Sequence, residues 1–356
     1  MNRIKNLLGK TETVHFTGIG GSGMNGIAHI LLNLGYKVQG SDLVPSEVTR
    51  RLKELGARIF TGHRAQNVWG ADVLVYSSAV QTSNPEIREA VKLKIPMIPR
   101  AEMLAELMRI KRGIAIAGTH GKTTTSSLIG HVFQTAGRKP TTIIGGKVFN
   151  FGAHARLGTG EFLICEADES DGSFLKLSPE SVVVTNIDND HLDYYHTMKN
   201  LKSAFIHFIN KVPFYGFTVL CLDDRNIRSI LPEIRKKVIT YGFHPGADFV
   251  ITRLDEVTFR LRYNSRFLKE VRMNKPGIHN MLNTTAAIIT GLEFGLSFID
   301  IEAGISTYKG VERRMEVIGA VRGIRIMDDY GHHPTEIKAT LNAVSLSKDF
   351  KRLIVV

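Results

Sequence analysis

Apolar residues in the first hundred positions occur in short runs, each followed by a segment with helical spacing. Each run has the length of one strand, and in the segment after it apolar residues recur at the interval of a helix. This alternation is typical of a parallel sheet whose strands are connected by helices. We therefore predict a Rossmann-like domain over residues 1–107, with strands at 14–19, 36–42, 57–60, 71–79 and 95–100 and helices at 25–34, 46–55, after Pro85 and at 100–109.

The alternation resumes with a buried strand at residues 114–118, which leads into a second glycine-containing loop. A longer series of strands and helical stretches follows it, so the second domain is the larger one. We predict a central α/β domain over residues 108–313, with further strands at 161–168, 181–188, 217–223, 237–242 and 257–263 and helices from near 126 and over 277–293.

A third segment, residues 314–356, contains candidate strands at 315–321 and 324–329, a helix after Pro334 and a final apolar run at 352–356. An apolar strand at the end of a parallel sheet leaves an edge that proteins normally cover. We therefore expect these residues to be the beginning of a third, Rossmann-like domain that is truncated.

Composition narrows the class of protein. The 356 residues are 43% hydrophobic and 22% charged, which is typical of a folded globular chain. The net charge of +12 favours anionic partners. The basic residues are scattered and form no arginine-rich arm, so the sequence does not point to nucleic acid as the partner. The two cysteines are far apart, and there is neither a cleavable leader nor an apolar run of transmembrane length. We expect a cytoplasmic protein.

The first glycine-rich turn, Gly18 to Gly23, connects a predicted strand to a predicted helix. Its backbone amides and the helix N-terminus can therefore bind a diphosphate. The alternative is a tight turn that serves packing alone. About twenty residues later, Asp42 ends the second strand, where an acidic residue can bind a ribose hydroxyl or a base, or can instead cap a helix.

The second loop, GTHGKTTT from Gly118 to Thr125, carries the sharpest chemical signal in the chain. Lys122 can bind the β- and γ-phosphates of a nucleotide, and the Thr123 hydroxyl can ligate Mg²⁺. Ile116 stands where the strict P-loop pattern has its first glycine, so the loop is a shortened variant. The central domain is therefore predicted to be of the P-loop ATPase type.

Four carboxylates follow the next buried strand, in the stretch EADESD at residues 166–171. Carboxylates gathered beside a phosphate loop repel one another, and a hard divalent cation such as Mg²⁺ relieves that repulsion. Some of the four can be surface residues or helix caps, and we select only Glu166 as a direct ligand. His191 follows the strand after it, on the same edge of the sheet, and is a candidate for metal ligation or phosphate contact, although a lone histidine is often structural.

These motifs resemble, in order, those of the Mur ligase family, which builds the peptide stem of bacterial peptidoglycan. The matching stretches are TGIGGSGM, GTHGKTTT, EADESD, TNIDNDHLD, GIHNMLN and DDYGHHPTE, and they span nearly the whole chain. The form GIGGSGM is similar to that of members acting on UDP-N-acetylmuramate and L-alanine, whereas relatives that recycle a tripeptide tend to carry a cysteine there.

The resemblance implies a set of site residues. For the UDP-sugar they are Gly20, Gly21, Ser22, Gly23, Met24, Ser41, Asp42 and His63. For ATP they are Gly118, Thr119, His120, Gly121, Lys122, Thr123, Thr124, His279, Asn280, Asn283 and Arg314. For Mg²⁺ they are Thr123, Glu166 and His191, and from the third domain Asp329 and His332 would reach in. The catalytic residues would be Lys122, His191 and Glu166.

The resemblance also implies the reaction. The sugar carboxylate would attack the γ-phosphate of ATP, and the amine of L-alanine would displace phosphate from the resulting acyl phosphate. Three alternatives stay open: a ligase of the same family that uses another amino acid or peptide, a non-catalytic UDP-sugar or nucleotide-binding module, and an NAD-dependent dehydrogenase. The dehydrogenase leaves the second phosphate loop unexplained.

Overall fold

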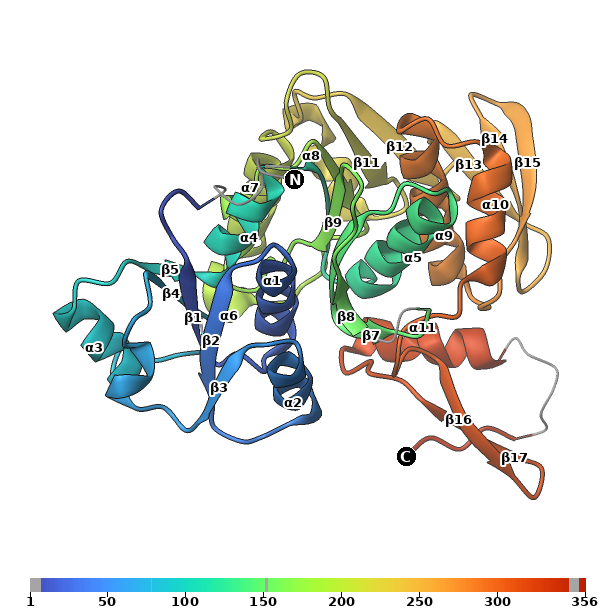
Figure 1. The fold of residues 1–356 in the computed structure, drawn as a ribbon. Helices are drawn as coiled ribbons and strands as arrows, with labels where there is room; N and C mark the ends of the chain where they lie inside the picture. Colours follow the sequence, from blue (N-terminus) through green and yellow to red (C-terminus); the bar gives the residue numbers. More distant parts are fainter. Residues whose placement is uncertain (1–7, 78, 110, 151–152, 346–351) are drawn as a thin grey trace.

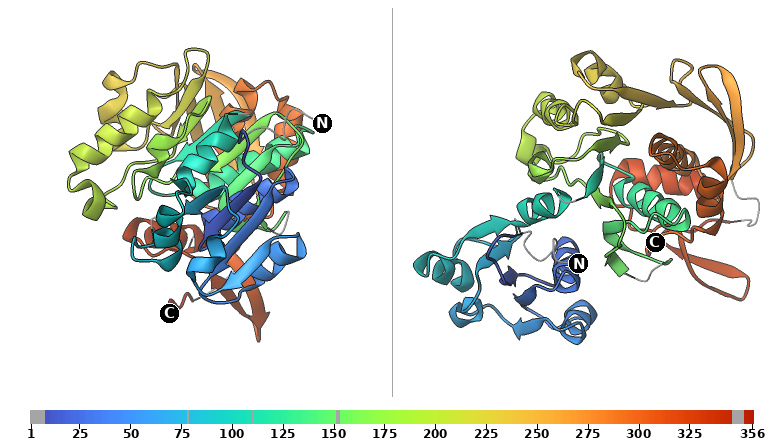
Figure 2. Two further views of the ribbon diagram at one scale, coloured as in Figure 1. Left: turned by 60° about the vertical axis from the view of Figure 1, so that its left-hand side comes forward. Right: turned by 45° about the horizontal axis from the view of Figure 1, so that its top comes forward.

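The computed structural model describes residues 8–77, 79–109, 111–150, 153–345 and 352–356. The strands form a five-stranded sheet, a ten-stranded sheet and a two-stranded sheet, and helices pack beside them (Figure 1). The chain is therefore an α/β protein, as predicted. Figure 2 shows the blue and teal first unit lying beside the central unit that contains the large sheet.

The five-stranded sheet is entirely parallel and has the order β3-β2-β1-β4-β5. The chain runs outward from β1 to β3 and then returns to the other side of β1, so the loop after β1 lies where the strand order reverses. The strands are β1 (Thr13–Thr17), β2 (Lys37–Asp42), β3 (Arg58–Thr61), β4 (Val73–Tyr76) and β5 (Met97–Pro99). The helices are α1 (Ser22–Asn33), α2 (Glu47–Glu54), α3 (Pro85–Lys92) and α4 (Arg100–Met108), with a 3₁₀ turn at Ala65–Val68. All five predicted strands are present.

The ten-stranded sheet has the order β15-β14-β13-β12-β11-β10-β6-β9-β7-β8. Its centre is parallel and buried, whereas β8, β14 and β15 pair antiparallel at the two ends. The strands are β6 (Arg112–Ala117), β7 (Thr141–Val148), β8 (Ala153–Arg156), β9 (Phe162–Glu166), β10 (Ser181–Val184), β11 (Phe217–Cys221), β12 (Val238–Gly242), β13 (Phe249–Arg253), β14 (Thr258–Tyr263) and β15 (Arg266–Arg272).

Apolar helices cover this central sheet. In Figure 1, α5, α9 and α10 lie side by side against it. The helices are α5 (Lys122–Thr135), α6 (Leu192–Tyr195), α7 (Met198–Ile209), α8 (Arg225–Ile230), α9 (Ile278–Glu293) and α10 (Phe298–Thr307), with 3₁₀ turns at Ser173–Lys176 and Leu231–Glu233. The helix predicted from near residue 126 begins four residues earlier, because the left-handed Gly121 already ends the loop. The prediction did not specify β7, β8, β13 or β15, whose pairing partners decide that they are strands.

The third segment begins with the antiparallel pair β16 (Glu316–Val321) and β17 (Ile324–Asp328), followed by α11 (Pro334–Ser345). Arg322 and Gly323 both have positive φ, as a tight hairpin turn requires. The predicted strand at residues 352–356 is wrong, because these residues have no strand partner and Ile354 is 66% exposed. Among the described residues, no helix is both long and apolar enough to cross a membrane.

Candidate functional site

The second glycine loop lies between the centre of the large sheet and a long helix. Strand β6 ends at Ala117, and α5 begins at Lys122. Gly118 and Gly121 have φ angles of 127° and 83°, which a side chain would strain. The first amides of α5 have no partners within the helix and can bind an anion. The local sequence therefore builds the phosphate loop that the motif predicts.

Lys122 is held in the loop by main-chain and carboxylate oxygens. Its ammonium donates a hydrogen bond to the Gly118 carbonyl at 2.7 Å and to both carboxylate oxygens of Glu169 at 2.8 Å. The Glu169 side chain is 1% exposed, so burial raises its pKa while Lys122 opposes that effect. Glu169 was not selected from the sequence, because nothing in EADESD distinguishes the one carboxylate that turns inward.

Glu166 lies beside this ion pair. It ends β9 and accepts a hydrogen bond from the Gly145 amide at 2.7 Å. Burial raises the pKa of Glu166, and hydrogen bonds from Gly145 and Thr123 act in the opposite direction. His191 reaches the same cluster from the loop after β10, with its Nε2 3.8 Å from Glu169 Oε1. The lysine-bearing loop therefore faces the residues predicted to bind metal.

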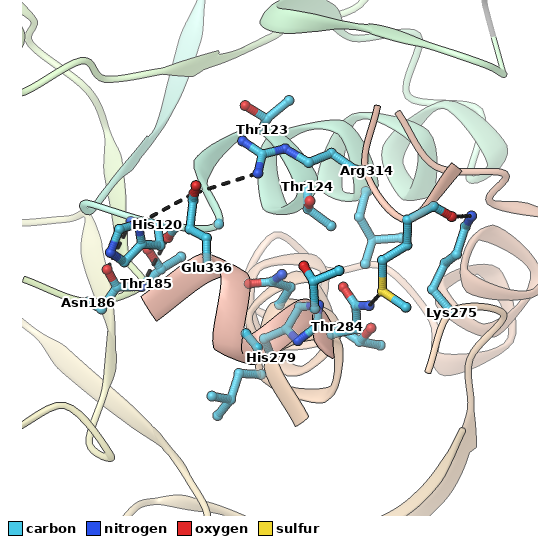
Figure 3. A pocket seen from close by; sticks show the side chains of 18 of the residues that line it. His120, Thr123, Thr124, Thr185, Asn186, Lys275, His279, Thr284, Arg314 and Glu336 are labelled. Carbon is cyan, nitrogen blue, oxygen red and sulfur yellow. Dashed lines mark hydrogen bonds and ion pairs between the residues drawn. The ribbon is translucent and has the colours of Figure 1, made fainter. Parts of the chain in front are cut away.

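A cavity of about 320 Å³ extends from the phosphate loop toward α9 and α11 (Figure 3). This volume is at the lower end of the range for small-molecule sites. The predicted residues that line it are His120, Gly121, Thr123, Thr124, His279, Asn280, Asn283, Arg314 and Asp329. Gly118, Thr119 and Lys122 belong to the same loop but do not line the cavity. Four chain segments that are distant in sequence thus meet around one space.

The N-terminal end of α9 forms the wall opposite the phosphate loop. Asn283 accepts a hydrogen bond from Thr125 at 3.1 Å, which fixes α9 against α5. Burial lowers the pKa of His279, so its imidazole is neutral near pH 7. A neutral imidazole and two amides can pair with a heteroaromatic base, whereas the loop at the other end suits phosphates.

The start of α11 closes one side of the cavity. Glu336 Oε1 lies 3.4 Å from His120 Nδ1 and 3.5 Å from Arg314 Nη1 (Figure 3). Although burial opposes it, these cations lower the pKa of Glu336 to about 2. Asp329 is held by the amides of Met315 and Gly331. Sequence reasoning missed Glu336, although it stands within the DDYGHHPTE stretch.

His332, which the resemblance placed at the site, and its neighbour His333 lie in different surroundings. The His332 side chain is 74% exposed and does not line the cavity. The ring of His333 instead lies 4.7 Å from that of His120, centroid to centroid. The helix start at Pro334 determines which of two adjacent histidines turns inward, and the sequence does not distinguish them.

The first glycine turn is tied to the second strand of its sheet. The Gly20 amide donates a hydrogen bond to Asp42 Oδ2 at 2.8 Å, and the Ser41 carbonyl accepts from the amides of Gly18 and Ile19. Ser46 caps α2, so the interpretation of Asp42 as a helix cap is wrong. Asp42 also borders a hollow of about 540 Å³ whose rim includes cationic side chains, namely Arg50 and Lys53.

Ser41 and His63 are held by a buried carboxylate, that of Glu86 on α3. The Glu86 side chain accepts hydrogen bonds from Ser41 Oγ at 2.7 Å, Thr17 Oγ1 at 2.9 Å, Asn67 Nδ2 at 2.7 Å and His15 Nε2 at 3.1 Å. His63 Nδ1 lies 2.8 Å from Ser41 Oγ. Sequence reasoning missed Glu86, because a glutamate in a helical first turn looks like an exposed residue.

The remaining predicted residues of the first loop differ in what they offer a ligand. Met24 is 2% exposed and packs in the core, so only its backbone is near the loop. Ser22 begins α1, and its side chain lies outside the described part of the chain. A side chain at Gly23 would overlap the guanidinium of Arg100. Arg100 also pairs with Asp168 at 3.5 Å, so it connects the first glycine turn with the carboxylate stretch of the central unit.

Two glycine-rich strand–loop–helix units on adjacent α/β units, with a carboxylate cluster beside the second loop, are typical of enzymes that use nucleotides. Three family models match successive parts of the chain: "Mur ligase family, catalytic domain" over residues 13–112, "Mur ligase middle domain" over 116–291 and "Mur ligase, glutamate ligase domain" over 313–356. The chain belongs to the Mur ligase family. The dehydrogenase interpretation is therefore wrong.

Related sequences and structures agree with this assignment. The UDP-N-acetylmuramate–L-alanine ligase of Geotalea daltonii is 55% identical over 98% of this chain and 77% of its own length, and that of Desulfatibacillum aliphaticivorans is 51% identical with the same coverage. The crystal structure of UDP-N-acetylmuramate-alanine ligase from Thermotoga maritima superposes with a TM-score of 0.83 at 27% identity, over 94% of this chain and 77% of that chain. The match thus covers about three quarters of the length of each relative.

Proposed function

We propose that this protein is an ATP-dependent amide-forming ligase that joins L-alanine to the carboxylate of UDP-N-acetylmuramate, a step in peptidoglycan precursor synthesis. The observation that carries the proposal is the cluster of Lys122, Glu169, Glu166 and Thr123. Of these residues, Thr123 also lines the cavity between the phosphate loop and α9, and the neighbouring Asp168 pairs with Arg100, which lies against Gly23 of the first glycine turn. Relatives more than 50% identical carry the name of this activity. We place the reaction in the cytoplasm, where both nucleotides are available.

ATP would occupy the cavity with its base toward α9 and its phosphates along the loop. Asn280 and Asn283 offer amide groups and His279 a neutral ring at the base end. Lys122 would exchange its contact with Glu169 for the β- and γ-phosphates, because a phosphate carries more charge than one carboxylate. Arg314 supplies a second cation from the junction with the third segment.

Glu166 and Thr123 fit a magnesium ion. Both offer hard oxygen ligands, and the burial that raises the pKa of Glu166 leaves a carboxylate whose charge a bound cation would stabilise. His191, beside Glu169, would complete the predicted ligand set. Bound Mg²⁺ would offset negative charge between the nucleotide and the attacking carboxylate.

The reaction would proceed in two steps. A carboxylate oxygen of the sugar attacks the γ-phosphorus of ATP, forming an acyl phosphate and releasing ADP. The unprotonated amine of L-alanine then attacks the acyl carbon, and the tetrahedral intermediate expels inorganic phosphate to leave an amide. Lys122 stabilises the transferring phosphoryl group. Of the two candidate bases for the amine proton, His191 lies beside the carboxylate cluster and His332 is exposed.

The UDP part of the sugar would bind at the first unit. The start of α1, where the first amides of a helix have no partners within it, suits a diphosphate, whereas the Gly20 and Gly21 amides are held by Asp42 and the Gly18 carbonyl. Asp42 and His63 would contact the uridine, and Ser41 would act chiefly by positioning His63, since the buried Ser41 hydroxyl donates its hydrogen bond to Glu86.

ADP release with UDP-N-acetylmuramate, ATP and L-alanine tests the proposal. We expect sustained ADP release to need all three substrates, because the reaction stops at the acyl phosphate when L-alanine is absent. We expect Lys122→Ala to abolish ADP release while UDP-sugar affinity stays unchanged. Lys199→Ala, at an exposed lysine on α7, is the matched control and should keep full activity. Turnover by Lys122→Ala would refute the role of the loop. Binding of both nucleotides without turnover would favour a non-catalytic module, and a preference for glycine, serine or a peptide over L-alanine would favour another ligase of the family.

A further inference from the structure

Three side chains of types that can ligate a metal meet where α11 touches the phosphate loop. They are different residues from the carboxylates expected to hold magnesium. His120 comes from the loop before α5, Asp188 from the segment after β10, and His333 from the residue before α11. One ligand atom from each lies within 4.8 Å of the others. Segments more than sixty residues apart in sequence thus place two imidazoles and a carboxylate around one point.

The distances within this triad are close to those of a ligand set. His120 Nε2 lies 3.1 Å from Asp188 Oδ2, and His333 Nδ1 lies 3.9 Å from the same oxygen. Ligand bonds of about 2.0 to 2.2 Å place neighbouring ligand atoms of a tetrahedral centre roughly 3.4 Å apart. Small rotations of two partly exposed rings would therefore suffice to bind an ion.

Residues around the triad already orient its members. Glu336 Oε1 lies 3.4 Å from His120 Nδ1, so this carboxylate can accept the Nδ1 N–H. His120 Nε2, which lies 3.1 Å from Asp188 Oδ2, would then bind an ion together with Asp188 in place of their direct contact. Metal-binding histidines usually have such a carboxylate partner. Asp188 is held by the Thr335 hydroxyl at 2.7 Å and by the Asn189 amide at 2.8 Å. Contacts from Thr335 and Glu336 on α11 thus hold Asp188 and His120 of this triad in place.

We propose that His120, Asp188 and His333 form a site for Zn²⁺ that joins the start of α11 to the phosphate loop. Two imidazole nitrogens and one carboxylate suit zinc or a similar transition ion, whereas Mg²⁺ prefers oxygen ligands alone. The site is distinct from the cluster of Glu166 and Thr123, and it does not depend on which amino acid the enzyme uses. Because His120 and α11 form two walls of the cavity between the phosphate loop and α9, bound zinc holds these walls together.

Isothermal titration of the nucleotide-free protein with ZnCl₂, in a buffer with millimolar Mg²⁺, tests the site. We expect one zinc per chain, and a loss of affinity of at least about tenfold in His333→Ala and in Asp188→Asn. His207→Ala, at an exposed histidine on α7, is the matched control and should bind as the wild type does. Both ligand variants change partly exposed side chains, and circular dichroism would confirm that they fold.

Cobalt provides a second measurement that reports the ligands directly. Co²⁺ in place of Zn²⁺ should give visible d–d absorption in the wild type, and His333→Ala should lose or shift these bands. Absence of saturable zinc binding would overturn the proposal and leave the triad as a set of ion pairs. Zinc affinity lost in His191→Ala but kept in His333→Ala would overturn it as well, by placing the ion at the other cluster. Displacement of zinc by millimolar Mg²⁺ would contradict the proposed nitrogen ligands.

Discussion

Replacing Glu86 by glutamine tests whether one buried carboxylate holds the first unit together. Glu86 is fully buried and accepts hydrogen bonds from His15, Thr17, Ser41 and Asn67. Glutamine keeps the shape of the side chain but removes the charge and turns one acceptor into a donor. At least one of the four donors would then face another donor, so we expect Glu86→Gln to be strongly destabilising.

The pKa of Glu86 sets the magnitude. Although burial alone would raise it, the hydrogen bonds from His15, Asn67 and Ser41 lower the pKa from 4.5 to about 2. A shift of this size corresponds to about 3 kcal/mol of stability near pH 7. Because the folded-state pKa lies below the unfolded one, this stability is present above pH 4.5 and is lost as the pH falls toward 2.

Urea unfolding followed by tryptophan fluorescence measures the effect. Trp69, the single tryptophan, lies in the first unit, where Gln39 donates hydrogen bonds to the carbonyls of Asn67 and Trp69. For a unit of this size we expect Glu86→Gln to lower the urea midpoint by about 1 to 3 M. Glu89→Gln, on the same helix and paired with the exposed Lys92, should change the free energy of unfolding by less than about 0.5 kcal/mol.

The reasoning would be refuted in either of two ways. One is a midpoint for Glu86→Gln equal to that of Glu89→Gln. The other is a difference between wild type and Glu86→Gln that stays constant from pH 7 to pH 3, because a lowered carboxylate pKa requires that difference to shrink on acidification.

Three further predictions concern the central unit. Glu336 and Asp188 together raise the pKa of His120 against the effect of burial, so Glu336→Gln should lower that pKa. An NMR titration of His120 that shows no change would contradict its contact with Glu336. Gly118→Ala should weaken ATP binding at least about tenfold and lower the melting temperature, because the φ of 127° and the lack of space for a Cβ both oppose a side chain. Wild-type ATP affinity and melting temperature, both measured by calorimetry, would disprove this prediction. Burial raises the pKa of Cys165 and Cys221 to about 12, so a thiol reagent at pH 8 should modify neither until urea unfolds the protein, and rapid reaction of the native protein would argue against the fold.

Local sequence was sufficient to predict the two strand–loop–helix units that we expect to bind phosphate. A buried strand, a glycine turn and a helix occur together at Gly18 to Gly23 and at Gly118 to Lys122, and the structure contains both strand–loop–helix units. The sheet order, the pairing of β7 with β8 and the antiparallel pairing of β14 with β13 and β15 did not follow from the sequence. Pairing depends on neighbours that are remote along the chain, and short apolar runs do not identify them.

The roles of individual carboxylates and histidines show the same limit. EADESD predicted a cation site, but only the packed structure turns Glu169 toward Lys122 and Asp168 toward Arg100. Glu86 looks like an ordinary helix residue until the sheet encloses it.

The sequence by itself therefore determined the class of fold, the two glycine-rich loops predicted to bind anions and, through its motifs, the resemblance to one family. These features depend on residues within a few positions of one another, whose backbone geometry and chemistry are local. The tertiary structure alone decided that His333 and not His332 meets His120, and that Glu336 closes one side of the cavity. It also decided that Glu86 is the buried acceptor for His15, Thr17, Ser41 and Asn67 in the first unit. Those contacts join segments distant along the chain, and only packing determines which side chain of a polar run becomes buried.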